Sequence, residues 1–173
     1  MSVSGLVGVT PIADSVATGA FDTVTPVADA DTKHYTVVVP AGTRAARFSL
    51  DSADDTADLD LFVYKGGTLV DLSASGSADE QVTMLDPAAG TYDVYVNGFA
   101  TPGGSTSYGL ANFVVPAADA LNLTLSPNPV PPPATLGDSA TVTGTWSGLD
   151  PAKRWFGVIS FAGSDVVTYF SVG

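Results

Sequence analysis

Short runs of alternating or β-branched apolar residues recur along the chain, and residues typical of turns separate them. The clearest runs are 34–39, 44–50, 59–64, 68–72, 80–85, 91–97 and 106–115. A period of two places successive side chains on opposite faces of a strand, so each run predicts a β-strand. Short strands at this spacing are typical of an antiparallel β-sandwich. We therefore expect an all-β, jelly-roll-like fold.

The residues between these runs support the same interpretation. Gly66-Gly67 separates two of the runs and predicts a tight hairpin, because glycine readily takes the positive φ that such turns require. Pro40-Ala41-Gly42 and the segment 87–90 combine proline with glycine in the same way. The turns are therefore predicted between the strands, as a sandwich requires.

The charged residues argue against a helical fold. They make up only 14% of the chain, and Glu80 is the only Glu among 18 acidic residues, so the rest are Asp. Asp, Gly, Pro and Thr form helices poorly, whereas Glu, Lys and Arg form them well. An all-α fold is therefore excluded.

The pattern changes after residue 115. A short apolar run at 121–125 is followed by the proline-rich stretch 127–133, which predicts an extended connection, and then by strand candidates at 140–146, 154–161 and 166–172. We expect two parts, a sandwich with an N-terminal extension at 1–117 and a C-terminal β segment at 118–173. The second part is small for an independent sandwich, so we expect it to dock on the first.

Charge and cysteine content restrict the partners and the chemistry. A net charge of −12 with only 6 Lys and Arg leaves no basic surface for nucleic acid, and no apolar run is long enough to span a membrane. The absence of Cys excludes disulfides, thiolate metal ligands and a Cys nucleophile. Residues 1–6 do not have the pattern of a signal peptide, so we expect the chain to be part of a longer protein. We expect a monomer.

Candidate catalytic residues are few. His34 is the only His, and it begins a predicted strand rather than lying in a loop that would carry a catalytic base. Neither Gly-x-Ser-x-Gly nor His-Glu-x-x-His occurs. A pair of carboxylates, as in a glycosidase, is the remaining catalytic alternative, although close Asp pairs are expected by chance in so acidic a chain. We expect a protein that is not an enzyme.

Two groups of Asp residues are candidates for calcium binding. One lies at 51–60 and the other at Asp29-Ala30-Asp31. Calcium takes six to eight oxygen ligands, and carboxylates two residues apart can converge on one ion. Asp58 and Asp60 would share one face of their strand, where a cation would relieve their repulsion. The alternative is a solvated, charged edge strand, and the frame of an EF-hand is absent.

Aromatic residues are the second group of candidates. Phe62 and Tyr64 would share the face of Asp58 and Asp60, and Tyr95 would lie on the corresponding face of the run 91–97. Together they would form an exposed platform for an extended peptide or a sugar. The alternative is that both faces of the sheet are covered and these side chains belong to the core.

Several motifs occur in the order typical of one known family. They are DLDLFVY at 58–64, SGSADEQVT at 75–83 and PAAGTYDVYV at 87–96, preceded by 39–43 and 46–50. Over roughly residues 30–115 the sequence resembles the bacterial pre-peptidase C-terminal domain. The flanking motifs Trp146-Ser147-Gly148-Leu149 and 156–160 are similar to the extreme C-terminus of secreted bacterial subtilisin-like serine peptidases.

The resemblance implies a non-catalytic, extracellular β-sandwich attached downstream of a serine protease catalytic domain. Its partner would be a protein or peptide substrate, or the catalytic domain of the same chain, which it would stabilise. The resemblance also implies calcium, with Asp29, Asp31, Asp58 and Asp60 as the matching acidic positions. The alternative is a structural or adhesive module of a bacterial cell-surface protein.

Overall fold

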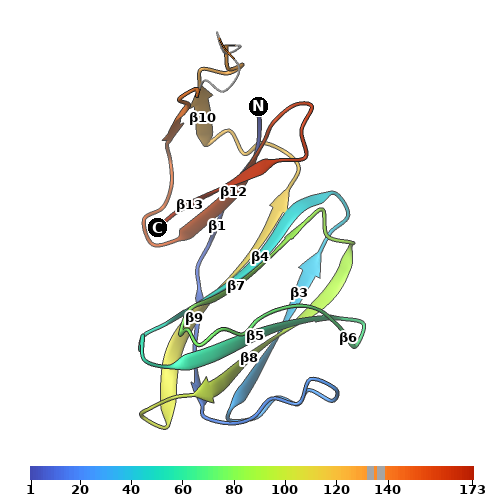
Figure 1. Ribbon diagram of the computed structural model, residues 1–173, viewed down its shortest axis with the longest axis vertical. Helices are drawn as coiled ribbons and strands as arrows, with labels where there is room; N and C mark the ends of the chain where they lie inside the picture. The colour runs from blue at the N-terminus through green and yellow to red at the C-terminus, as the bar shows by residue number, and fades with distance from the viewer. Residues whose placement is uncertain (132–134, 136–138) are drawn as a thin grey trace.

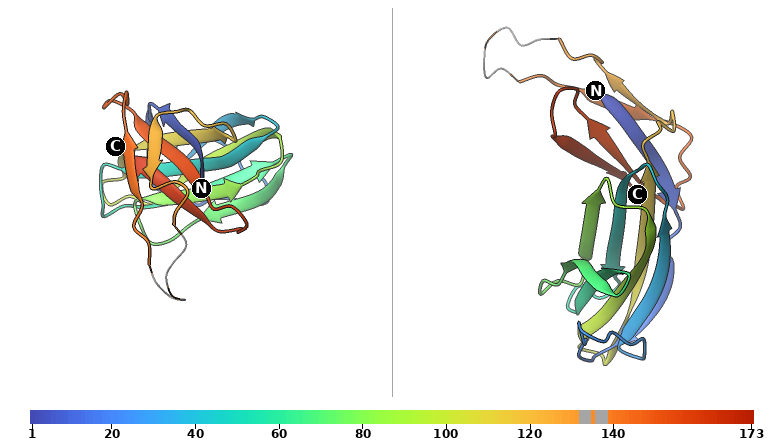
Figure 2. Two further views of the ribbon diagram at one scale, coloured as in Figure 1. Left: turned by 90° about the horizontal axis from the view of Figure 1, so that it is seen from above. Right: turned by 90° about the vertical axis from the view of Figure 1, so that its right-hand side faces the viewer.

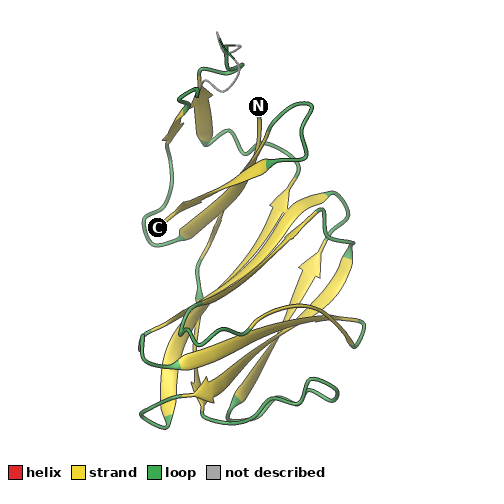
Figure 3. Cartoon of the chain, viewed as in Figure 1, coloured by secondary structure: helices red, strands yellow, loops and turns green. Residues whose placement is uncertain are grey.

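The computed structural model describes residues 1–131, 135 and 139–173, and the described residues form strands and loops without a helix (Figure 3). Pro132 and Pro133 of the proline-rich stretch lie outside this range. The strands are β1 (Ser2–Val9), β2 (Ile12–Ala17), β3 (Thr32–Val39), β4 (Thr43–Ser52), β5 (Asp58–Lys65), β6 (Thr68–Ser73), β7 (Glu80–Leu85), β8 (Gly90–Ala100), β9 (Ser105–Pro116), β10 (Leu123–Ser126), β11 (Thr143–Trp146), β12 (Arg154–Ser160) and β13 (Val167–Val172).

Two four-stranded antiparallel sheets face each other and form the sandwich (Figures 1 and 2). One has the strand order β2-β9-β4-β7 and the other β3-β8-β5-β6. The apolar side of each strand turns inward, as the period of two predicts. Fully or almost fully buried apolar side chains fill the space between the sheets, among them Phe48, Leu50, Leu59, Leu61, Val63, Val94 and Leu110. The expected fold class is confirmed.

The hairpin between β5 and β6 has the expected turn. Gly66 and Gly67 have φ angles of 57° and 78°, so both central residues have left-handed backbone. This is the combination that a two-residue turn needs to match the twist of an antiparallel pair. Lys65 pairs with Thr68 across the turn.

A smaller three-stranded sheet, with the order β1-β12-β13, lies beside the upper end of the sandwich (Figure 1). It packs on the outer face of β4 and β9, where the rings of Phe113 and Phe156 lie 5.5 Å apart. The ribbon of β10 and β11 covers its other face through Leu123 and Leu125. Strand β1 belongs to the first of the two expected parts and β12 to the second, so the two parts share this sheet.

The N-terminal residues connect the two sheet systems. Strand β1 pairs with β12, and after Thr10 and Pro11 the chain continues as β2, which pairs with β9 of the sandwich. The sequence pattern predicted neither strand. Their formation joins the small sheet to the sandwich through continuous backbone as well as through side-chain packing.

Candidate calcium site and aromatic face

Most of the predicted site residues lie on one surface, the outer face of the sheet β3-β8-β5-β6. Leu59, Leu61 and Val63 of β5 point into the core, so Asp58, Asp60, Phe62 and Tyr64 alternate onto the opposite face. In the register of β5 and β8, Asp60 lies opposite Asn97, Phe62 opposite Tyr95 and Tyr64 opposite Asp93. The structure therefore places the predicted aromatic residues beside the predicted carboxylates of β5.

The connection between β2 and β3 covers the aromatic part of this face. Phe21 stacks on Phe62 with ring centroids 4.1 Å apart, and it also contacts Tyr95 at 5.7 Å. The Tyr64 hydroxyl donates a hydrogen bond of 2.8 Å to the carbonyl of Thr23. Phe62 and Tyr64 are consequently only 6% and 2% exposed. The exposed platform expected for these residues is covered in this structure, and substrate binding by them stays a prediction.

One edge of the aromatic cluster reaches solvent. Tyr95 is half-buried, and the ring of His34 stacks on it at 4.6 Å. His34 Nε2 lies 2.8 Å from an oxygen of Asp93, and both side chains are about one third exposed. His34 therefore has a structural partner and a stacking surface on the sheet.

The carboxylates of β5 lie in a partly desolvated environment. Burial, together with the smaller effects of the neighbouring charges of Asp58 and Glu80, raises the pKa of Asp60 to about 6. Asp58 Oδ1 is buried and has no hydrogen-bond partner among the described residues. Two acidic groups that are short of partners and close together favour a cation between them.

Asn97 adds a third oxygen to this group. It is fully buried, and its Nδ2 donates to the carbonyls of Gly19 and Asp31 and to Thr32 Oγ1, at 3.3, 3.0 and 3.2 Å. These three acceptors fix the orientation of the amide. Its Oδ1 is buried and finds no partner in the described part of the chain. Because Asn97 lies directly opposite Asp60, this oxygen is on the same face as the two carboxylates.

Glu80 lies next to the group but is already satisfied. It is 4% exposed, and its carboxylate accepts hydrogen bonds from Ser73 Oγ, from Ser75 Oγ and, at 2.9 Å, from the Ser75 amide. It contributes negative charge to the surroundings of Asp60. On this face, the buried oxygens without partners are therefore those of Asp58 and Asn97, and Asp60 lies opposite Asn97 on the neighbouring strand.

The second predicted acidic pair is arranged differently. Asp29 Oδ1 accepts hydrogen bonds of 3.0 Å from the amides of Asp31 and Thr32, which forms the turn before β3. A side-chain hydrogen bond between the two carboxyl groups lowers the pKa of Asp29 and raises that of Asp31. Asp31 reaches Asn97 through its backbone carbonyl rather than its carboxylate. The four predicted Asp side chains thus form two separate pairs.

The described residues contain no group of three or more His, Cys, Asp or Glu side chains arranged to hold a metal ion. On this face, the carboxylates of Asp58 and Asp60 and the amide of Asn97 are the oxygen-bearing side chains that β5 and β8 bring to the same region. Sequence reasoning placed Asn97 on this face by period but did not single it out. An amide opposite an Asp-x-Asp motif on the neighbouring strand is the signal that could have found it.

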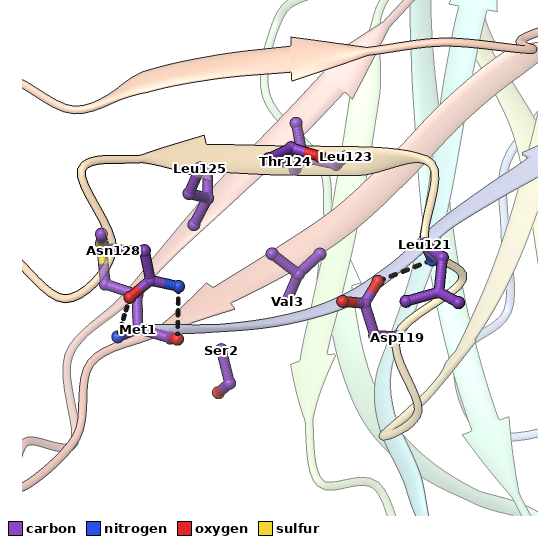
Figure 4. A pocket seen from close by; sticks show the side chains of 9 residues that line it. All are labelled: Met1, Ser2, Val3, Asp119, Leu121, Leu123, Thr124, Leu125 and Asn128. Carbon is purple, nitrogen blue, oxygen red and sulfur yellow. Dashed lines mark hydrogen bonds between the residues drawn. The ribbon is translucent and has the colours of Figure 1, made fainter.

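A groove of about 410 Å³ lies elsewhere, between the start of β1 and strand β10 (Figure 4). Hydrogen bonds between Met1 and the side chain of Asn128, of 3.0 and 3.1 Å, close one end of it. Asp119 contributes a carboxylate to the lining of the groove, and this carboxylate accepts a hydrogen bond of 2.8 Å from the Leu121 amide. None of the sequence-predicted site residues lines this groove.

Fold and site together define a small antiparallel sandwich with a pair of carboxylates beside an aromatic cluster on one outer face. The family model described as bacterial pre-peptidase C-terminal domain matches residues 31–98. The matched segment runs from the start of β3 into β8 and includes both Asp58 and Asp60. The resemblance that the motifs predicted is therefore confirmed over this segment. Domains of this family are non-catalytic accessory domains.

Comparison with other known proteins adds little to this assignment. No curated protein matches the chain. Among solved structures, the periplasmic inhibitor of g-type lysozyme PliG from Aeromonas hydrophila is similar at 16% identity and a TM-score of 0.39. That match covers 64% of this chain and 88% of PliG, and it is too remote to indicate a function. The described residues include no helix long and apolar enough to cross a membrane.

Proposed function

We propose that this chain is the non-catalytic accessory domain of a secreted subtilisin-like serine protease, and that it binds protein substrate or stabilises the catalytic domain. The observation that carries the proposal is the family match over 31–98, which includes the five consecutive strands β3 to β7 and most of β8. The sequence motifs at 146–149 and 156–160 support attachment to a protease of the subtilisin type.

The proposal is tested by binding to insoluble proteins. The purified chain is mixed with collagen, keratin or cross-linked casein, and in parallel with a bacterial cell-wall preparation, with serum albumin as the inert control protein. We expect the chain to sediment with at least one of the insoluble proteins and not with cell wall. Sedimentation with cell wall alone would indicate an adhesive module instead.

Stabilisation of a catalytic domain needs a separate measurement. A subtilisin-type catalytic domain is heated with and without the chain, and the remaining activity is assayed on casein. We expect slower loss of activity with the chain than with serum albumin. Cleavage of casein by the chain alone, abolished by a serine protease inhibitor, would contradict a non-catalytic role.

We propose further that Asp58, Asp60 and Asn97 hold one calcium ion. Two carboxylates and an amide oxygen are the donor types that calcium prefers, and water molecules would complete its six to eight ligands. The proposal is supported by two buried oxygens on this face that lack partners among the described residues, Asp58 Oδ1 and Asn97 Oδ1. A buried polar atom without a partner costs free energy that a bound cation would recover. Asp29 and Asp31 form their own pair, and a role for them in calcium binding stays a prediction.

Calcium binding is tested by isothermal titration calorimetry of the metal-free protein. We expect binding of one ion, and we expect Asp58→Asn to weaken it at least about tenfold because a charged ligand becomes neutral. Asp55→Asn is the matched control, because Asp55 lies in the same acidic stretch but is exposed. Equal loss of affinity in both variants would show that only the overall negative charge attracts calcium.

A further inference from the structure

A buried arginine lies on the outer face of the other sheet of the sandwich. Arg47 of β4 lies opposite Thr83 of β7 and Phe113 of β9. The small sheet covers it, and the residue is only 7% exposed. The centre of its guanidinium group lies 3.8 Å from the ring centroid of Phe156 and 4.8 Å from that of Tyr169. Aromatic rings therefore lie against the faces of the guanidinium group and leave its N–H edges for hydrogen bonds.

Only part of this edge is used within the protein. Arg47 Nε donates a hydrogen bond of 2.8 Å to Thr83 Oγ1, and Nη1 donates a long one of 3.4 Å to Ser171 Oγ. Nη2 makes no hydrogen bond to any residue in the described ranges. Both partners are neutral hydroxyl groups, so the positive charge of Arg47 is left without a counter-charge from them.

The other two arginines of the chain each have a carboxylate partner. Arg44 pairs with Asp86 and Arg154 pairs with Asp51. Arg47 is more buried than either, yet no Asp or Glu of the described chain forms an ion pair with it. This is unexpected in a protein with 18 acidic residues. Buried charges are normally paired, because removing an isolated charge from water is costly.

The cost of burying the charge of Arg47 is reflected in the pKa of its guanidinium group. Burial lowers the pKa of Arg47, and the nearby Tyr169 only partly offsets that effect. An anion that reached the free edge of the guanidinium group would be held by a charge-assisted hydrogen bond in a low-dielectric environment.

A cleft of about 170 Å³ gives access to this edge. It lies between the sandwich and the small sheet, and its polar lining comes from Arg47, Ser49, Gln81, Arg154 and Ser171. We call it the Arg47 cleft. Asp51 already pairs with Arg154, so among the side chains that line the cleft Arg47 is the charged one without a carboxylate partner in the described residues; the backbone of Gly173 completes the lining. The hydroxyl groups and the amide provide further hydrogen-bond donors.

We propose that the Arg47 cleft binds one carboxylate group of a peptide or protein partner. A planar carboxylate matches the edge of a guanidinium group and carries the single charge that the cleft can balance. Multiply charged phosphates are disfavoured by the net charge of −12. The proposal that the cleft binds a carboxylate depends only on the residues of the cleft. The proposal that a peptide or protein supplies this carboxylate rests on the function proposed above.

Calorimetric titration with three probes tests the proposal. The probes are acetate, acetylated trialanine with a free C-terminal carboxylate, and the same peptide with an amidated C-terminus. We expect the free acid to bind at least about tenfold more tightly than the amide, because a charge-assisted hydrogen bond to a buried guanidinium is lost in the amide. A third peptide, amidated but with an internal Glu, distinguishes a side-chain carboxylate from a chain terminus.

Matched variants locate the site. Arg47→Lys keeps the charge but removes the planar donor edge, and we expect it to weaken binding of the free acid about tenfold. Arg44→Lys is the control, since Arg44 lies on the same strand and pairs with Asp86 outside the cleft, and we expect less than about a twofold change. If Arg47→Lys fails to fold, the Nε–Hε resonance of Arg47 in the unaltered protein gives the answer. It should shift with the free acid and not with the amide.

The possible outcomes separate the two proposals. If acetate binds but neither the peptide with a free C-terminus nor the amidated peptide with an internal Glu binds, the carboxylate site is supported. A protein is then excluded as the source of the carboxylate. Equal affinity for acid and amide would overturn the proposal, and so would equal effects of the two arginine variants. The absence of any heat or resonance shift with acetate would overturn it as well, without affecting sedimentation on insoluble proteins.

Discussion

The protonation of Asp60 gives the most direct test of the outer-face site. Burial and the charges of Asp58 and Glu80 raise the pKa of Asp60 to about 6 in the folded protein, against about 3.9 in an unfolded chain. The folded state therefore holds this proton more tightly than the unfolded state does. In metal-free protein, the resulting stabilisation is complete below about pH 4 and is lost as the pH rises through about 6.

The size of the effect follows from the shift. A difference of about two pKa units corresponds to about 3 kcal/mol if it is converted in full. Asp60 is only half-buried, so water screens part of this cost, and we expect about 1–2 kcal/mol of lost stability at neutral pH. Asp60→Asn removes the charge at every pH. In metal-free protein at neutral pH we therefore expect it to raise the melting temperature by roughly 2–8 °C.

Calcium should reverse the order of the two proteins. A ligand at about 100 times its dissociation constant stabilises the folded state by about 2.7 kcal/mol, so the unaltered protein should melt several degrees higher with calcium than with EDTA. Asp60→Asn should lose most of this gain, while the exposed Asp55→Asn should keep it. Melting is followed by circular dichroism at several pH values. A metal-free melting temperature that is constant from about pH 4 to pH 7 would refute the reasoning.

Three further substitutions test the packing described above. Phe21→Ala should lower the free energy of urea unfolding by about 1–2 kcal/mol and increase the binding of a hydrophobic dye, because it uncovers the aromatic face. Val24 is 84% exposed, so the control Val24→Ala should change stability by less than about 0.5 kcal/mol. Phe156→Ala should cost about 3–5 kcal/mol, since Phe156 is fully buried between the small sheet and the sandwich, and a smaller loss would contradict that docking. Gly67→Ala should cost about 1 kcal/mol because of its φ of 78°, and Gly76→Ala, where φ is not positive, should cost less in the same urea titration.

The strands of the sandwich could be predicted because period-two alternation is a property of the sequence itself. The run 80–85 coincides with β7, and each of the other runs differs from its strand by at most three residues at either end. Strands β1 and β2 could not be predicted in this way. Gly5 and Gly8 interrupt the first, and in the second Val16 is the one fully buried side chain. Their pairing with β12 and β9, distant in sequence, provides what their own pattern lacks.

The candidate site could be predicted only in part, for a related reason. Alternation alone placed Asp58, Asp60, Phe62 and Tyr64 on one face of β5. The segment 18–31 has no period, so nothing in its sequence indicated that Phe21 would cover that face. The unsatisfied oxygen of Asn97 results from three hydrogen bonds to the residues around it, and such an orientation is a tertiary property.

Arg47 was overlooked because a charged residue that alternates with apolar ones predicts a solvent-facing position. Arg47 does point away from the sandwich core, but the small sheet covers that face through Phe156. The two proposed sites therefore lie on opposite outer faces of the sandwich. The carboxylates of Asp58 and Asp60 lack a cationic partner on one face, and the guanidinium group of Arg47 lacks an anionic partner on the other. Because the core separates them, calcium bound near Asp60 would not compete with a carboxylate bound at Arg47. A protein partner could then engage the cleft while calcium stabilises the sheet on the far side.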